Sequence, residues 1–101
     1  MSVNFSPCVL IPCYNHGAMM PGVLARLKPF NLPCIVVDDG SDAATQQQLD
    51  NLISEQPDVT LIRLAENAGK GAAVLSGMQA AAEAGFSHAV QVDADGQHAI
   101  E

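Results

Sequence analysis

Two short acidic motifs contain the residues whose type and spacing best suit chemistry. Asp38 and Asp39 follow the apolar run CIVV, and Asp93 and Asp95 stand two apart after the run HAVQV. Packed carboxylates repel one another and lose hydration, so each motif predicts a ligand or a metal that relieves this cost. Side chains two apart in an extended segment point the same way, and their oxygen atoms favour Mg²⁺ or Mn²⁺. The second motif is therefore a candidate metal site.

Four short apolar runs define the elements that must position these acids, and each predicts a strand. The runs are CVLIP (8–12), CIVVD (34–38), VTLIRL (59–64) and HAVQVD (88–93). The intervening segments of helical composition are 17–28, 42–55 and 70–84. Strands that alternate with helices pair in parallel and are buried on both faces. The sequence therefore predicts an α/β fold, a parallel sheet with helices on both faces.

Two of these helices have features that predict how they begin and pack. Ser41 or Asp42 can cap the helix at 42–55. Its apolar face is expected to carry Leu49, Leu52 and Ile53. The helix at 70–84 is rich in Ala and Gly, so it can lie close to the sheet. Its packing face is expected to carry Val74, Met78 and Ala81.

Polar residues follow every predicted strand. The segments are 12–15, 38–39, 67–71 and 93–95. In an open parallel sheet, ligands bind beyond the carboxyl ends of the strands, where loops and helix N-termini meet. We therefore expect the four segments to form one polar rim and the binding site to lie there.

Composition limits the partners and the compartment. The 101 residues carry a net charge of −7 with only four Lys and Arg, which argues against nucleic acid or an anionic membrane surface as the main partner. Three cysteines without a CxxC pair are expected to be buried thiols in a reducing compartment, and the cytoplasm is the default. The sequence shows no targeting signal, and no apolar stretch approaches the roughly 20 residues of a membrane span.

Four motifs together resemble the inverting family 2 glycosyltransferases, which use nucleotide-sugar donors on a GT-A fold. The motifs are VLIPCYN (9–15), VVDDGSD (36–42), ENAGKGAA (66–73) and VDADGQH (92–98). The resemblance covers nearly the whole chain and implies the N-terminal part of a GT-A fold. It also implies metal-dependent, inverting transfer of a sugar from a nucleoside diphosphate, with UDP expected over GDP. The acceptor, a glycan, a lipid or a protein, is left open.

The same resemblance implies roles for the residues that bind the base. Pro12, Tyr14 and Asn15 would shape the base pocket, with Tyr14 stacking on the nucleobase. Asp39 would accept a hydrogen bond from a uracil-like N3–H. The chemistry agrees, because a ring N–H needs an acceptor and the face of a base needs an apolar or aromatic wall.

The remaining residues of the motifs concern the diphosphate and the loops. The resemblance implies that Asp93 lies near the ribose and that Asp95 holds the Mg²⁺ or Mn²⁺ ion that bridges the diphosphate. Asp38 has two interpretations that both remain open, a carboxylate that caps or orders a loop and a ligand contact. Lys70 either approaches the nucleotide or stabilises the loop through one of the two aspartates.

The general base of the reaction is not expected in this sequence. In the family, the carboxylate that deprotonates the acceptor comes from a segment well beyond Asp95, past Glu101. We therefore interpret residues 1–101 as a single nucleotide-sugar-binding domain that is truncated at its C-terminal end and inactive alone. Any association with a membrane is expected to come from the missing C-terminal segments. Such a truncation would expose a sheet edge and favour self-association. The alternative is a non-catalytic nucleotide-binding or structural α/β fragment.

Overall fold

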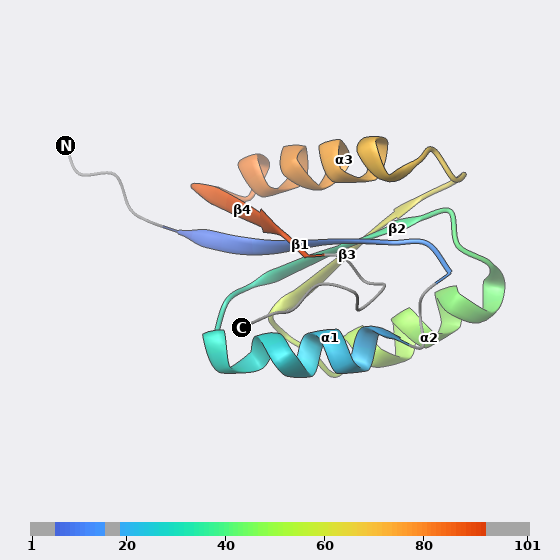
Figure 1. Cartoon of the computed structure of the whole chain (residues 1–101), viewed down its shortest axis with the longest axis horizontal. Helices are drawn as coiled ribbons and strands as arrows, with labels where there is room; N and C mark the ends of the chain where they lie inside the picture. The colour runs from blue at the N-terminus through green and yellow to red at the C-terminus, as the bar shows by residue number, and fades with distance from the viewer. Residues whose placement is uncertain (1–5, 16–18, 93–101) are drawn as a thin grey trace.

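The computed structural model describes residues 6–15 and 19–92 (Figure 1). Strands and helices alternate along these residues in the predicted order. The elements are β1 (Pro7–Cys13), α1 (Met20–Leu27), η2 (Lys28–Phe30), β2 (Cys34–Asp39), α2 (Ala43–Ile53), β3 (Val59–Leu64), α3 (Lys70–Glu83) and β4 (His88–Gln91). The first helix ends at Leu27, one residue earlier than predicted, because Pro29 has no N–H to donate to the Ala25 carbonyl, and the chain continues into the 3-10 turn η2.

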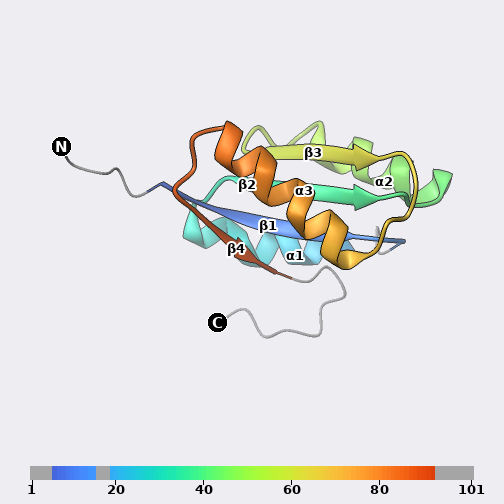
Figure 2. The same cartoon turned by 90° about the horizontal axis from the view of Figure 1, so that it is seen from above.

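The strands form one parallel sheet in the order β3-β2-β1-β4. Viewed from above, β4 lies beside β1 on the opposite side from β2 and β3 (Figure 2). The chain therefore builds outward from β1 to β3 and then returns past β1. Such a reversal of strand order opens a crevice at the carboxyl ends of the flanking strands, here β1 and β4, and ligands bind in such crevices.

Helices cover both faces of the sheet, as predicted (Figure 1). Alternate residues of β1 and β2 point to opposite faces, which gives two cores. The core under α1 and α2 contains Val9, Ile11, Cys13, Met20, Val23, Leu24, Leu27, Cys34, Val36 and Leu49. The core under α3 contains Cys8, Leu10, Ile35, Val37, Ala73 and Ala81. The predicted face of α2 is confirmed, since Leu52 and Ile53 pack against the first core beside Leu49.

The predicted packing face of α3 is wrong at Met78, whose exposed fraction is 46%. The buried residues of α3 are Ala73, Gly77 and Ala81, which stand four apart along one stripe. A Cβ on Gly77 would overlap Leu10 Cδ1, so the helix approaches the sheet more closely than a large side chain allows. Met78 lies next to this stripe and outside the contact.

The end of α3 is fixed by its backbone. Gly85 adopts φ 92°, the N–H of Phe86 donates to the Ala81 carbonyl (3.0 Å), and the N–H of Gly85 donates to the Ala82 carbonyl (3.1 Å). This pair of bonds is a Schellman motif, which directs the chain into β4. No helix among the described residues is long and apolar enough to cross a membrane.

Candidate functional site

The structure brings three of the four predicted polar segments to one rim of the sheet. Asp38 and Asp39 end β2, Tyr14 and Asn15 follow β1, and the loop 65–69 leads from β3 into α3. The fourth segment, 93–95, lies outside the described residues. Hydrogen bonds join the segment after β1 to Ser41 and Asp42 of the turn after β2. Two separate sets of contacts centre on the two aspartates, and those of Asp39 reach the loop before α3.

Asp39 fastens the loop before α3. Its exposed fraction is 3%, and its carboxylate accepts hydrogen bonds from Ala68 N (2.8 Å), Gly69 N (3.0 Å) and Asn67 Nδ2 (3.1 Å). The carboxylate thus lies at the N-terminus of α3, where the helix dipole favours a negative charge. A carboxylate has about four lone-pair positions. By this count Asp39 retains capacity for one further donor, such as a ring N–H.

Gly40 allows the two loops to touch. Its φ is 69°, and a Cβ at this position would overlap Asn67 N and the carbonyl carbon of Glu66. Asn67 Nδ2 also donates to the Asp39 carbonyl (3.1 Å). Only glycine combines this backbone conformation with so close an approach. The turn after β2 and the loop before α3 therefore form a single unit.

Asp38 is fully buried and takes the loop-ordering role in this structure. One carboxylate oxygen accepts from Ser41 N (3.0 Å) and the other from Arg63 Nε (3.0 Å). A buried carboxylate requires such partners because burial removes its hydration. The hydrogen bond to Asp38 raises the pKa of the Arg63 guanidinium, and Asp50 adds to this effect.

The segment after β1 is held by the turn after β2. Asn15 adopts φ 54°, its N–H donates to Ser41 Oγ (3.0 Å), and its Oδ1 accepts from Asp42 N (2.8 Å). Asp42 in turn accepts from Thr45 N (2.8 Å), so it is the N-cap of α2, one of the two predicted caps. This bond lowers the pKa of Asp42.

Two of the predicted base-pocket residues have contrasting environments. Pro12 is buried within β1, opposite Val37 of β2. Tyr14 has an exposed fraction of 46% and follows β1 at the crevice between β1 and β4. An exposed aromatic ring beside a fixed backbone provides a surface on which a base can stack.

The family model for glycosyl transferase family 2 matches residues 8–101. The chain belongs to glycosyl transferase family 2. This match confirms the family that the four motifs indicated, and with it the assignment of the chain to the glycosyltransferases. A mannosyltransferase from Pyrobaculum calidifontis, solved in complex with GDP-Man and Mn²⁺, has 26% sequence identity and a TM-score of 0.72 over 88% of this chain and 27% of that chain. This likeness confirms the predicted GT-A fold.

Two curated relatives show how much of a longer protein this chain covers. A polyprenol monophosphomannose synthase from Mycolicibacterium smegmatis is 38% identical over 96 residues, which cover 92% of this chain and 36% of that protein. A UDP-N-acetylglucosamine–dolichyl-phosphate N-acetylglucosaminyltransferase from Methanococcus voltae is 35% identical over 104 residues, which cover 90% of this chain and 41% of that protein. The chain thus spans well under half the length of these relatives.

Of the predicted cation Lys70 and the predicted metal ligand Asp95, the structure describes only Lys70. Lys70 is the first residue of α3 and is exposed, directly after the loop that Asp39 fastens. Within residues 6–15 and 19–92, no three His, Cys, Asp or Glu side chains are grouped so that they could hold a metal ion. Asp38 and Asp39 are engaged by hydrogen-bond donors and do not form such a group. On this chain, the predicted ligand Asp95 and its neighbour Asp93 lie outside the described residues.

Sequence reasoning missed Arg63 and gave no role to Asn67. Arg63 stands directly opposite Asp38 in the register of β2 and β3. The only signal in the sequence was a cation within the mainly apolar strand VTLIRL. The pairing of this cation with Asp38 depends on the register of two strands that are distant in the sequence, which local patterns do not predict. Asn67 belonged to a quoted motif, and its bonds to Asp39 explain why an amide suits that position.

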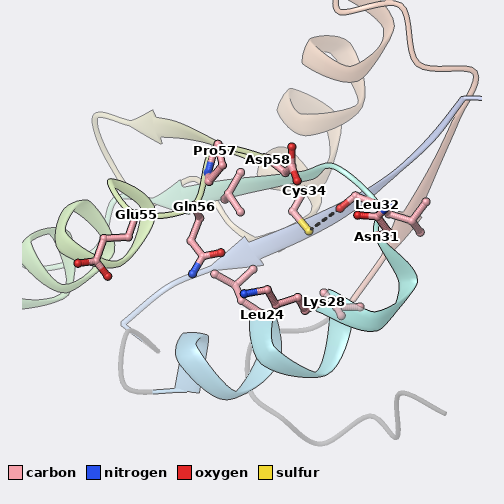
Figure 3. Close-up of a pocket in the computed structure, with 11 residues that line it drawn as sticks. Leu24, Lys28, Asn31, Leu32, Cys34, Glu55, Gln56, Pro57 and Asp58 are labelled. Atoms are coloured by element: carbon pink, nitrogen blue, oxygen red, sulfur yellow. Dashed lines mark hydrogen bonds between the residues drawn. The ribbon is translucent and has the colours of Figure 1, made fainter.

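A pocket of about 250 Å³ lies at the opposite, amino end of the sheet (Figure 3). Its lining includes Leu24, Leu27, Lys28, Cys34, Asp58 and Val59. Cys34 Sγ donates to the Leu32 carbonyl (3.6 Å), and burial raises the pKa of this thiol to about 11. All three cysteines are buried thiols that form no disulfide, as predicted. Because ligands of such sheets bind at the carboxyl ends of the strands, we assign no ligand to this pocket.

Proposed function

We propose that this chain forms the donor-nucleotide part of a glycosyltransferase that transfers a sugar, with inversion, from a nucleoside diphosphate to a polyprenyl or dolichyl phosphate. Family membership supports the reaction class. The names of the relatives support the acceptor, because they include a polyprenol monophosphomannose synthase, an undecaprenyl-phosphate mannosyltransferase and a dolichyl-phosphate transferase. We therefore propose a lipid phosphate as the acceptor, which the sequence alone left open.

The observation that carries the proposal is the buried carboxylate of Asp39 at the carboxyl end of β2, with exposed Tyr14 directly after the neighbouring strand β1. Three donors from the loop before α3 fix the carboxylate, and one lone-pair position by count is left for a base N–H. A fixed acceptor and an aromatic surface are the two features that recognition of a planar base requires. Pro12 and Asn15 would shape this pocket from the end of β1.

We expect the base to be uracil. Its N3–H fits a single carboxylate acceptor, whereas guanine presents both a ring N–H and an amino group. GDP is the competing donor, because the solved mannosyltransferase contains GDP-Man. The comparison of UDP with GDP therefore belongs in the first binding experiment.

We propose that Asp95 binds Mg²⁺ or Mn²⁺ and that Asp93 lies near the ribose, with Lys70 approaching the nucleotide. The structural relative was solved with Mn²⁺, which supports a divalent cation. When bound, such an ion neutralises charge on the leaving nucleoside diphosphate. The acidic balance of this chain makes a cation useful, because carboxylates at the rim repel a bare diphosphate. We expect the general base outside residues 1–101.

Isothermal titration calorimetry with uridine, UDP and GDP, in MnCl₂ and in EDTA, tests the proposal. Asp39→Ala should weaken uridine and UDP alike, roughly tenfold or more, since one charge-assisted hydrogen bond is lost. Asp95→Ala should weaken UDP only and should remove the difference between Mn²⁺ and EDTA. Asp58→Ala is the matched control, because Asp58 is exposed at the amino end of the sheet.

Two results would contradict the assignment. Equal UDP affinity in Mn²⁺ and EDTA would exclude the metal role of Asp95. Equal loss of uridine affinity in the Asp39 and Asp95 variants would show that the rim is not divided between base and diphosphate. An assay of UDP release and glycoside formation with a polyprenyl phosphate then separates a transferase from a module that only binds nucleotides. Because we propose that the general base lies outside residues 1–101, we expect this chain alone to form no glycoside.

A further inference from the structure

Arg63 joins three elements of the fold at the edge of the candidate site. Its Nε donates to Asp38 Oδ2 (3.0 Å), while its Nη2 donates to Asp50 Oδ1 (3.1 Å) and to the Gln46 carbonyl (3.4 Å). Asp38 ends β2, Arg63 belongs to β3, and Asp50 and Gln46 belong to α2. The guanidinium fork therefore links both strands to the helix.

The bond to Asp38 differs in kind from the bond to Asp50. Asp38 has a fully buried side chain, whereas the Asp50 side chain is 55% exposed. An exposed ion pair contributes little, but removal of the partner of a buried charge leaves that charge uncompensated. The position of the Asp38 carboxylate thus depends on Arg63, and Asp50 can be changed without exposing Asp38.

Asp38 passes this constraint to the turn after β2. Its second oxygen accepts from Ser41 N (3.0 Å), and the Ser41 carbonyl accepts from Gln46 Nε2 (2.9 Å). Ser41 is itself buried, and its Oγ accepts from the N–H of Asn15 (3.0 Å). Arg63 is therefore connected to the segment after β1 through the side chains of Asp38 and Ser41.

Asn15 depends on these contacts because its backbone is in an uncommon conformation. Its φ of 54° is tolerated by asparagine yet less favourable than an extended or helical conformation. The hydrogen bonds with Ser41 and with Asp42 N hold it there. Tyr14 precedes it directly, so the backbone that carries the exposed ring is fixed at the same point.

We propose that Arg63 is a positioning residue of the nucleobase site. It compensates the charge of Asp38 and, through Asp38 and Ser41, holds Asn15 and Tyr14 in the geometry that binds the base. This inference rests on the proposed function, because it assumes that Tyr14 and its neighbours bind a nucleotide.

Calorimetry on Arg63→Ala and Arg63→Lys, with Asp50→Asn as the matched control, tests this role. The titrations are made at a temperature at which circular dichroism shows each variant fully folded. Arg63→Ala should raise the Kd of uridine and of UDP by the same factor, roughly tenfold, because both ligands share the base. Arg63→Lys should recover part of the loss, since it keeps the charge without the fork. Asp50→Asn should stay within about twofold of the wild type.

A double-mutant cycle shows whether Arg63 acts through Asp38. On an Asp38→Asn background, the further change Arg63→Ala should alter uridine affinity little, because the charge that Arg63 compensates is already gone. Full additivity of the two changes would overturn the proposed route. If Arg63→Ala does not fold, the cycle is run with Arg63→Lys.

Amide hydrogen exchange measured by NMR gives a readout that does not need a nucleotide. Exchange of the Asn15 N–H should become faster in Arg63→Ala and remain unchanged in Asp50→Asn. A lower melting temperature with unchanged uridine affinity and unchanged Asn15 exchange would make Arg63 merely structural and overturn the proposal. If the wild type binds no nucleotide, the proposed function fails and with it the binding role, while faster Asn15 exchange would still show the contact route itself.

Discussion

Gly40→Ala should separate the two loops of the rim. Gly40 has φ 69°, where a Cβ costs about 1–2 kcal/mol. The new Cβ would also overlap backbone atoms of Glu66 and Asn67 and lie 2.9 Å from Asn67 Cα. Rotation of a side chain cannot relieve an overlap with backbone, so the loop before α3 must move away.

The cost of this movement follows from the bonds that cross the contact. Asp39 holds the loop through Ala68 N, Gly69 N and Asn67 Nδ2. Loss of one hydrogen bond to a charged group costs about 1.5–3 kcal/mol, and with the strain at residue 40 the total is about 2.5–5 kcal/mol. This is a large part of the roughly 5–15 kcal/mol that stabilises a domain. In the fraction that folds, the carboxylate of Asp39 loses its fixed direction.

Urea unfolding and calorimetry with uridine measure the two consequences. We expect Gly40→Ala to lower the free energy of unfolding by the amount above and to raise the Kd of uridine by roughly tenfold or more. Gly85→Ala is the matched control, since Gly85 also has a positive φ of 92° but no atom lies within 4 Å of a Cβ built there. It should cost only the strain, about 1–2 kcal/mol, and should leave binding unchanged.

Gly40→Asn separates the strain of the positive φ from the overlap of the added Cβ. Asparagine tolerates a positive φ but carries a Cβ, so Gly40→Asn should be nearly as damaging as Gly40→Ala. If Gly40→Ala costs no more than Gly85→Ala, or if uridine affinity is retained, the close approach of the two loops does not support the site and the reasoning is refuted.

Three other predictions concern stability and assembly. The pKa of Asp42 is lowered by its bond from Thr45 N, so the stability contributed by this cap is present above the ordinary aspartate pKa of about 4 and is lost as the pH falls through the folded value. Asparagine can also cap a helix but does not titrate, so the difference in melting temperature between wild type and Asp42→Asn should shrink as the pH falls from about 6 to about 2.5. A constant difference would contradict the lowered pKa of Asp42. Gly77→Ala should destabilise the protein by about 1 kcal/mol net, because overlap with Leu10 outweighs the gain in helix propensity. Gly22→Ala, where a Cβ meets nothing within 4 Å, should instead stabilise the protein by about 0.5–1 kcal/mol in the same urea titration. β4 is an outer strand of the described sheet, and Val90 on it is 54% exposed, so we expect the chain to self-associate through this edge. Sedimentation velocity should show association that rises with protein concentration and that Val90→Lys reduces. A monomer at all concentrations would rule out association through this edge.

The sequence alone determined the order of elements and predicted the place of the candidate site. Strand runs and helix patterns are local, since each depends on the spacing of apolar residues within a few positions. Every strand end is confirmed within one residue except the end of β4, which comes at Gln91, two residues earlier than predicted. The rule that ligands bind beyond the carboxyl ends of parallel strands then placed Asp38, Asp39 and the loop before α3 together. The four motifs indicated the family, which the family model confirms.

Tertiary structure alone decided what each aspartate contacts. Arg63 is 25 residues from Asp38 in the chain, and only the parallel register of β2 and β3 sets them opposite one another. The sequence likewise did not distinguish Met78 from Gly77 as the contact of α3. Small and apolar residues occur on more than one face of this helix, so its rotation is set by how closely it can approach the sheet. Pairing across strands and contact between layers depend on residues far apart in the sequence, and no local pattern records them.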